Sequence, residues 1–291
     1  MSVRKIKDFV EGETIVNYPF ILKELKEGLT VTNKPFINMT LADKEEAIHG
    51  VIWDLIPGVD YEEIGKATFV LVDGEIGSYK GNLQVTVTRI QGVNIKHPVI
   101  EENIDLLLKR THIDINAVYD NIIQDIDSFI DLEIATFLKE MLERNKFQFK
   151  TFPAAWNNHH AYYGGLIQHT WEMYQMVDNL PFEGINKELL KAGVILHDIG
   201  KTQEYLVNEI YQVVDMTFIG RTLGHITIGV NMISSLASEL SISSGLAEKL
   251  MHMVAAHHRE LEYGSPVKPA FKEAMILCYL DELSAKTQMI E

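Results

Sequence analysis

The sequence predicts two folded parts, a small antiparallel β-barrel followed by an all-helical domain. Between residues 13 and 93, short runs rich in β-branched and aromatic residues are separated by turn signals. From Pro98 onward, apolar residues recur at helical spacing and no clear strand-forming run returns. We therefore assign residues 1–97 to a β domain and residues 98–291 to a helical domain.

The composition is that of an ordinary globular protein. The chain has 291 residues, of which 46% are hydrophobic and 23% are charged, which excludes collagen-like, disordered and low-complexity classes. The 26 basic and 41 acidic side chains give a formal net charge of −15, whereas strong nonspecific nucleic-acid binders are usually basic. Tight general binding of nucleic acid is not expected, although a local basic groove or metal ions could hold phosphates.

The sequence gives no sign of export or of a membrane partner. Its single cysteine, Cys278, cannot form an intrachain disulfide, and no apolar run reaches the roughly 18 residues needed to span a bilayer. Basic residues near the start are followed by acidic residues instead of the apolar core of a signal peptide. We expect a cytoplasmic protein, and a homo-oligomer remains open.

The first three strands of the β domain follow from alternation and one turn. Apolar and β-branched residues recur at period two from Thr14 through Val16 and Tyr18 to Leu22. Residues 36–40 and 48–53 then flank an Asp-Lys-Glu-Glu turn at 43–46, as the strands of a hairpin would.

Two further strands complete the expected barrel. Thr68 to Val72 and Leu83 to Ile90 are rich in β-branched residues, and Lys80-Gly81-Asn82 between them is a turn signal. About five short strands fit a small closed barrel, of which the OB-fold is a common binder of nucleic acids and oligosaccharides. The alternative is a β domain used for oligomerisation.

An OB-fold holds a single strand by stacking bases on aromatic rings, worth about 1–3 kcal/mol per base, and by placing cations along the backbone. For each aromatic ring the competing explanation is burial in the barrel core, which is least convincing for Tyr79 beside the turn. The candidate contacts are Phe36, Trp53 and Tyr79 for bases, and Lys80 and Arg89, with Lys66 and Lys96, for phosphates.

The helical domain concentrates histidines. Asn116 is a candidate cap for its first clear helix, whose apolar face would extend to Ile130. Eight of the eleven histidines lie between residues 159 and 258, several on apolar helix faces where an unpartnered polar group costs roughly 1–3 kcal/mol. Five stretches present imidazole or carboxylate to one interior: His169, His197 with Asp198, His225, His257 with His258, and Asp281.

Metal binding explains this convergence better than five separate coincidences. A lone histidine on an apolar face is usually a hydrogen-bonded core residue, and Asp281 alone would more often be a cap or a surface residue. Neutral imidazoles with carboxylates and no thiolate suit Mn, Fe, Co or Zn, and the candidates outnumber the four or so ligands of one catalytic ion. Two ions about 3.5–4 Å apart polarise a phosphoryl oxygen and activate water, which points to phosphoester hydrolysis.

The order of these residues resembles the H…HD…H…H…D signature of HD-domain metal-dependent phosphohydrolases, an all-helical fold. The whole chain resembles the YhaM-type 3'-5' exoribonucleases, which join an N-terminal OB-fold to an HD domain. The passages that carry the likeness are His159 to Thr170, Leu196 to Lys201, Leu223 to Ile226, His257 to Pro269 and Tyr279 to Lys286.

The resemblance implies a role for each ligand. His169, His197 and Asp281 would hold one ion, Asp198 would bridge two, and His225 with His257, and in one variant also His258, would hold the second. Two divalent ions are implied, manganese first, with Fe, Co or Zn as alternatives. Asp198 and Lys201 would be catalytic, with the Lys201 ammonium facing the phosphate; the alternative is a solvated lysine that favours a helix C-terminus.

Other positions depart from the family pattern or extend it. Ser284 stands where a second Asp is expected and Cys278 where a His is common, which affects substrate contacts or ligand support more than the metal ligands. His159 and His160, with Trp156, precede the first ligand helix and are candidates for the mouth of the site; a satisfied loop is the alternative. Arg221 is a further substrate candidate, or it pairs with acidic neighbours.

The expected function is metal-dependent removal of nucleotides from the 3' end of single-stranded RNA, with single-stranded DNA as a candidate second substrate. The preference for RNA rests on the resemblance alone. One alternative is an HD-domain phosphodiesterase or phosphatase that acts on free or cyclic nucleotides. The other is a nucleic-acid-binding protein with a non-catalytic metal site.

Overall fold

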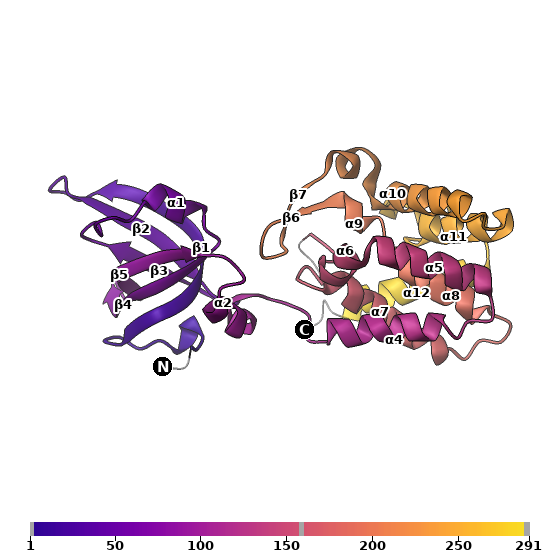
Figure 1. Cartoon of the computed structure of the whole chain (residues 1–291), viewed down its shortest axis with the longest axis horizontal. Coiled ribbons are helices and arrows are strands. Elements are labelled where there is room, and N and C mark those ends of the chain that lie inside the picture. The colour runs from indigo at the N-terminus through magenta and orange to yellow at the C-terminus, as the bar shows by residue number, and fades with distance from the viewer. Residues whose placement is uncertain (1–2, 157–159, 288–291) are drawn as a thin grey trace. The chain divides into compact units, whose positions relative to one another are not determined.

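The computed structural model describes residues 3–156 and 160–287, and the chain divides into two compact units, Met1–Lys109 and Arg110–Glu291. The first unit is a β-barrel and the second is a helical domain (Figure 1). This confirms the predicted fold class. Among the described residues, no helix is both long enough and apolar enough to cross a bilayer.

The barrel of the first unit has the strand order of an OB-fold. Its five strands close in the order β1-β2-β3-β5-β4, and every neighbouring pair is antiparallel except β3 with β5. A closed barrel leaves no long unpaired edge, and its interior is filled by apolar side chains such as Ile37, Val72 and Val85. The strands are β1 Thr14–Leu29, β2 Pro35–Ala42, β3 Ala47–Ile52, β4 Phe69–Tyr79 and β5 Asn82–Val93, with α1 Tyr61–Lys66 between β3 and β4.

Both predicted hairpin turns are confirmed. In the turn between β2 and β3, Asp43 Oδ1 accepts from the backbone amides of Glu45 at 2.7 Å and Glu46 at 2.8 Å. Between β4 and β5, Lys80 and Gly81 have φ of 52° and 84°, the left-handed conformation that a two-residue hairpin turn of type I′ requires at both positions.

The predicted alternation at the start of β1 is wrong for Thr14 and Val16. A bulge shifts the pairing of β1 with β4 between Ile15 and Tyr18, and Asn17 adopts a φ of 51°. Because one extra residue turns the preceding side chains to the opposite face, Ile15 is buried while Val16 is 71% exposed. The backbone amide of Asn17 donates to Asp73 Oδ1 at 2.6 Å, which fixes the bulge.

Residues 98–109 belong to the barrel unit, whereas the sequence-based boundary assigns them to the helical domain. The short helices α2 Pro98–Glu102 and α3 Ile104–Leu107 bury Ile100 and Leu107 completely. The backbone amide of Lys44 also donates to the carbonyl of Leu106 at 3.1 Å. Helical spacing in this segment therefore marks a cap on the barrel and not the start of the second unit.

The second unit is built around helix α8, which packs against α5, α7, α11 and α12. Its core includes Phe137, Leu190, Leu250 and Leu277. The helices are α4 Ile115–Ile126, α5 Leu132–Arg144, α6 Lys146–Thr151, α7 Gly165–Asp178, α8 Lys187–Leu196, α9 Lys201–Glu204, α10 Phe218–Glu239, α11 Ser244–Ala256 and α12 Lys272–Thr287, and two 3-10 turns lie at Ile6–Asp8 in the first unit and Leu261–Tyr263 in the second.

Two sequence expectations fail in this unit. Helix α4 is capped by Asp114, which accepts from the amide of Asn116, and it ends before Ile130, which is 91% exposed. A two-stranded hairpin, β6 Tyr205–Val207 with β7 Val213–Met216, interrupts the helices. Strands of three and four residues are too short to show a period in the sequence.

Candidate metal centre

The predicted ligands lie where five helices meet. His197 and His257 are the residues that end α8 and α11, and His225 follows a kink in α10 where Gly224 adopts a φ of 69°. Asp198 and His258 come directly after these two helix ends, and their side chains line the same cavity. Together with His169 of α7 and Asp281 of α12, these side chains lie in or directly beside a cavity of about 690 Å³.

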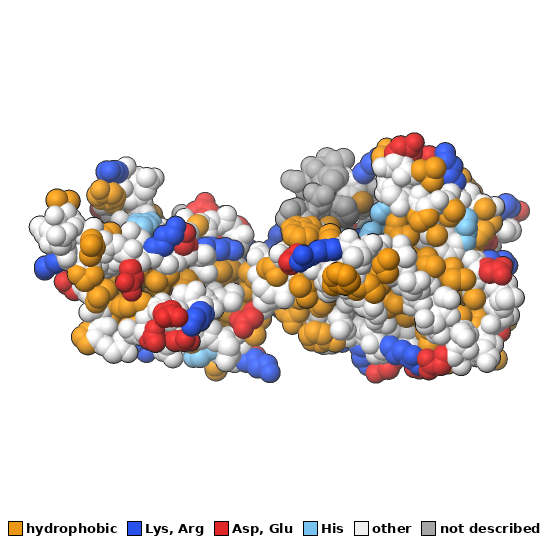
Figure 2. Space-filling model, turned by 90° about the horizontal axis from the view of Figure 1, so that it is seen from above, with side chains coloured by type: hydrophobic (Ala, Val, Ile, Leu, Met, Phe, Trp, Pro, Cys, Tyr) orange, Lys and Arg blue, Asp and Glu red, His pale blue; other side chains and the backbone are white. Residues whose placement is uncertain are grey.

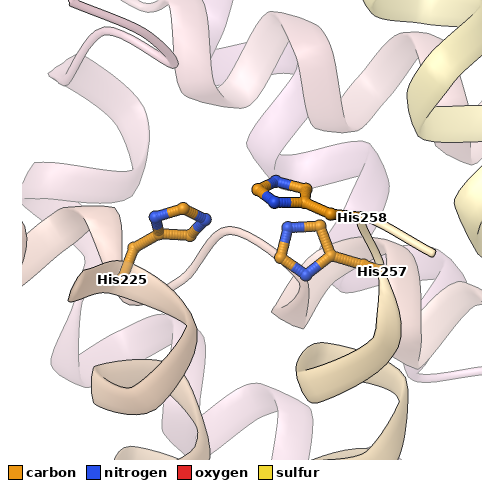
Figure 3. Close-up of side chains that lie close together, drawn as sticks. All are labelled: His225, His257 and His258. Atoms are coloured by element: carbon orange, nitrogen blue, oxygen red, sulfur yellow. The ribbon is translucent and has the colours of Figure 1, made fainter. Parts of the chain in front are cut away.

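The ligands form two groups. In the first, His169 Nε2 lies 3.2 Å from His197 Nε2 and 3.1 Å from Asp281 Oδ1. In the second, nitrogen atoms of His225, His257 and His258 lie within 4.8 Å of one another. Figure 3 shows the three rings of this second group around one space, with His225 from α10 and the other two from the end of α11.

Asp198 lies between the two groups. Its Oδ2 is 3.3 Å from Nε2 of His197, and its Oδ1 is 3.7 Å from Nε2 of His225 and 3.9 Å from Nε2 of His257. Oδ1 and both of the latter nitrogen atoms are buried and have no hydrogen-bond partner among the described residues. Buried polar atoms are normally satisfied, so three such atoms around one point fit the coordination of a cation.

The other ring nitrogens define the tautomers. Nδ1 of His197 lies 2.8 Å from the carbonyl oxygen of Val194, and Nδ1 of His257 lies 2.7 Å from that of Val254. Because a carbonyl oxygen only accepts, Nδ1 carries the proton and Nε2 presents a lone pair to the carboxylates. The ring of His258 is fixed in the same way by the carbonyl of Tyr263 at 2.9 Å.

The charge states also suit a divalent cation. Burial lowers the pKa of His169, His257 and His258, which favours the neutral imidazole that binds metal. Burial opposes ionisation of Asp198, but Lys201, His197 and His225 together outweigh it and lower the pKa of that carboxyl. Burial likewise disfavours the charged form of His197, whereas the carboxylates of Asp198 and Asp281 raise the pKa of this imidazole. Neutral imidazoles with ionised carboxylates fit the predicted ions.

Lys201 lies on the cavity wall and is not the solvated lysine of the alternative reading. Its Nζ donates to Asp198 Oδ2 at 2.6 Å, and its side chain is 13% exposed. Glu204 is also buried near His225, and it is not among the residues predicted from the sequence. Glu204 Oε1 accepts from the backbone amide of His225 at 2.9 Å and lies 3.5 Å from its Nδ1.

The residues predicted to contact substrate do not all line the cavity. His160 is buried, its ring centroid is 5.4 Å from that of His169, and it does not line the cavity. Trp156 does line it. Arg221 is exposed, lies outside the cavity lining and pairs with Asp215, as its alternative reading expected. His159 lies outside the described residues.

The two positions that depart from the family pattern are both near the ligands. Ser284 Oγ lies 3.0 Å from His169 Nδ1, so this side chain supports a ligand. The Cys278 thiol lines the cavity and donates to the carbonyl of Ala274 at 3.1 Å. Burial raises the pKa of this thiol to about 11, which keeps it protonated and unsuited to binding metal.

The aromatic candidates of the barrel lie mainly on its surface. The rings of Phe36 and Trp53 stack with centroids 5.5 Å apart, and Trp53 is 49% exposed. Gly28 leaves room for this pair, because a Cβ there would lie 2.7 Å from the Phe36 ring. Tyr79 is 59% exposed, so burial in the core is the wrong explanation for Trp53 and Tyr79.

The basic candidates of the barrel are interspersed with acids. The ammonium of Lys80 lies 5.1 Å from the centroid of the Tyr79 ring, and Arg89 lies 3.6 Å from Asp73. On the face shown in Figure 2, basic, acidic and apolar side chains alternate without a continuous basic band.

Comparison with known proteins agrees with this geometry. The family model of the HD domain matches residues 166–286, which contain every predicted ligand. The second unit therefore contains an HD domain, a fold of the metal-dependent hydrolase superfamily, and the first unit is an OB-like barrel.

The solved structures that match the chain include two described here. The second OB-fold domain of replication protein A from Methanococcus maripaludis is 16% identical with a TM-score of 0.24, over 32% of this chain and 95% of that one. A protein described as an aspartyl-tRNA synthetase from Leishmania major Friedlin is 11% identical with a TM-score of 0.22, over 83% of this chain and 51% of that one. At these TM-scores neither likeness supports a conclusion.

Proposed function

We propose that the protein is a metal-dependent 3'-5' exonuclease that removes nucleotides from single-stranded RNA. The observation that carries the hydrolytic part is the position of Asp198, with one oxygen toward each histidine group and unpartnered atoms around Oδ1. His169, His197 and Asp281 would hold one divalent ion, and His225, His257 and His258 a second, with Asp198 shared.

Two ions, manganese in the first instance, would supply Lewis acidity toward a phosphoryl oxygen and lower the pKa of an attacking water. Several side chains of the centre, among them His169, Asp198 and His257, are buried, and charge effects are stronger in such surroundings than in water. Lys201, which lines the cavity and donates to Asp198, would stabilise negative charge on the phosphate and so act as a catalytic residue.

The barrel would hold the single-stranded nucleic acid. Phe36 and Trp53 form a stacked pair with one ring exposed, and Tyr79 adds a second exposed ring with Lys80 beside it. Stacked bases gain about 1–3 kcal/mol each on such rings with little sequence preference. The choice of RNA over DNA and the 3'-5' polarity rest on the resemblance to the YhaM-type exoribonucleases.

A labelled single strand tests the proposal directly. The full-length protein with Mn²⁺ should convert 5'-labelled single-stranded RNA into a ladder of progressively shorter products, and His197→Ala and Asp198→Ala should abolish it. His252→Ala is the matched control, because His252 Nε2 accepts from the amide of Ala270 and lies outside both ligand groups. Activity on cyclic or free nucleotides without a ladder would assign the centre to the alternative phosphodiesterase function.

A further inference from the structure

A carboxylate outside both ligand groups lies behind His169. Glu172 is one turn further along α7, and its side chain is 24% exposed. Its Oε2 accepts from Ser284 Oγ of α12 at 2.9 Å and lies 3.2 Å from His160 Nε2, while its Oε1 accepts from the Gln168 amide at 2.9 Å. These neighbours hold the carboxylate in one orientation.

The directions of the hydrogen bonds follow from the chemistry of Glu172. An ionised carboxylate can only accept, so the single hydroxyl proton of Ser284 points to Glu172. The Ser284 oxygen must then accept from His169 Nδ1, which lies 3.0 Å away. Nδ1 of His169 therefore carries a proton, and its Nε2 presents a lone pair.

That lone pair faces other electron-rich atoms. His169 Nε2 is 3.1 Å from Asp281 Oδ1 and 3.2 Å from Nε2 of His197, whose own Nδ1 donates to a carbonyl. A divalent cation among these three atoms would turn a repulsive contact into a set of ligand bonds. The tautomer of His169 is thus the one that a metal ion at the first group requires.

We infer that Glu172 is a positioning residue of the first metal group, acting through Ser284 to hold His169 in the tautomer and orientation that present Nε2 to the cation. This inference rests on the proposed metal centre. His197 and His257 donate instead to neutral main-chain carbonyls. The hydrogen bonds from His169 lead through Ser284 to the ionised carboxylate of Glu172. Such a partner raises the basicity of a histidine ligand.

His160 belongs to the same arrangement. Its buried ring lies near both residues, with Nε2 3.2 Å from the Glu172 carboxylate and its centroid 5.4 Å from that of the His169 ring. His160 would therefore support the carboxylate from outside the cavity lining.

Calorimetric titration of the metal-free full-length protein with Mn²⁺ tests the inference. Glu172→Gln and Ser284→Ala should each weaken one of two Mn²⁺ equivalents by roughly 10–100-fold and leave the other unchanged. The double variant should lose no more than the stronger single variant, because both substitutions break the same chain. Glu133→Gln is the matched control, since Glu133 also accepts from a serine hydroxyl, that of Ser243, at 2.7 Å.

The outcomes are distinct. Wild-type affinity for both equivalents in Glu172→Gln, or additive losses in the double variant, would overturn the inference. If the wild-type protein itself binds no Mn²⁺, the proposed metal centre fails instead. Nitrogen-15 NMR of labelled histidines in the metal-free wild-type protein tests the inference without any variant: His169 protonated at Nδ1 supports it, and His169 protonated only at Nε2 refutes it.

Discussion

Replacing Gly200 by alanine should displace the second histidine group, which contains His225, relative to the first. Gly200 precedes α9 in ordinary helical backbone, with φ −61° and ψ −23°, so its role is space and not conformational freedom. A Cβ there would lie 2.0 Å from the carbonyl oxygen of His225 and 2.9 Å from the amide nitrogen of Gly229. Both atoms belong to the backbone of α10 and cannot rotate away.

The size of the effect follows from these distances. Real Cβ atoms stay beyond 3.0 Å from such neighbours, so the separation between residue 200 and the His225 carbonyl must grow by at least 1.0 Å. Metal ligands tolerate deviations of only about 0.2 Å, and overpacking typically costs about 1–3 kcal/mol. Gly200→Ala should therefore lower the free energy of unfolding by that amount and weaken the Mn²⁺ equivalent that His225 holds.

Urea unfolding and Mn²⁺ calorimetry measure both parts. The matched control is Gly245→Ala in α11, where no atom lies within 4 Å of the added Cβ; it should be neutral or stabilise the protein by up to about 1 kcal/mol. The reasoning is refuted if Gly200→Ala unfolds like the wild type and binds both Mn²⁺ equivalents with unchanged affinity.

Three further predictions concern the barrel and the acid response. Trp53→Ala should weaken binding of a single-stranded oligonucleotide by about 1–3 kcal/mol in fluorescence anisotropy and leave Mn²⁺ binding intact; unchanged binding would remove Trp53 from the interface. Deleting residues 1–109 should impair cleavage of long single strands and spare very short ones, and equal loss on both would make that unit structural. Burial disfavours ionisation of Glu172, but hydrogen bonds led by that from His160 lower its pKa to about 2. Because the unfolded value is about 4.3, its stabilisation is complete above that pH and is lost as the pH falls toward 2. The difference in Tm between wild type and Glu172→Gln should accordingly shrink from pH 6 to pH 3, and a constant difference would contradict this.

Much of the architecture could be predicted from local patterns. Both hairpin turns of the barrel are encoded by the residues that form them, Asp43 in one and Lys80-Gly81 in the other. The bulge in β1 could not be predicted, because it depends on Asp73, 56 residues away in the chain. A one-residue shift reverses which side chains face the core, so this missing contact changed the predicted exposure of Val16.

The candidate site likewise combines features that local sequence predicts with contacts between residues far apart in the sequence. Helical spacing and helix ends were enough to identify side chains directed to one interior, since those signals are local. The residues behind them were not predictable in this way: Ser284 reaches Glu172 across 112 positions of sequence, and Glu204 meets His225 across 21. Nothing in the sequence around Glu172 distinguishes it from a solvent-facing helix glutamate.

Anomalous diffraction from crystals of the full-length protein grown with Mn²⁺ tests the central claim most directly. Two peaks are predicted, one bounded by His169 Nε2, His197 Nε2 and Asp281 Oδ1, and one bounded by His225, His257 and His258, with an oxygen of Asp198 toward each. Peaks elsewhere, or ordered ligand side chains with no anomalous density among them at saturating Mn²⁺, would contradict the account.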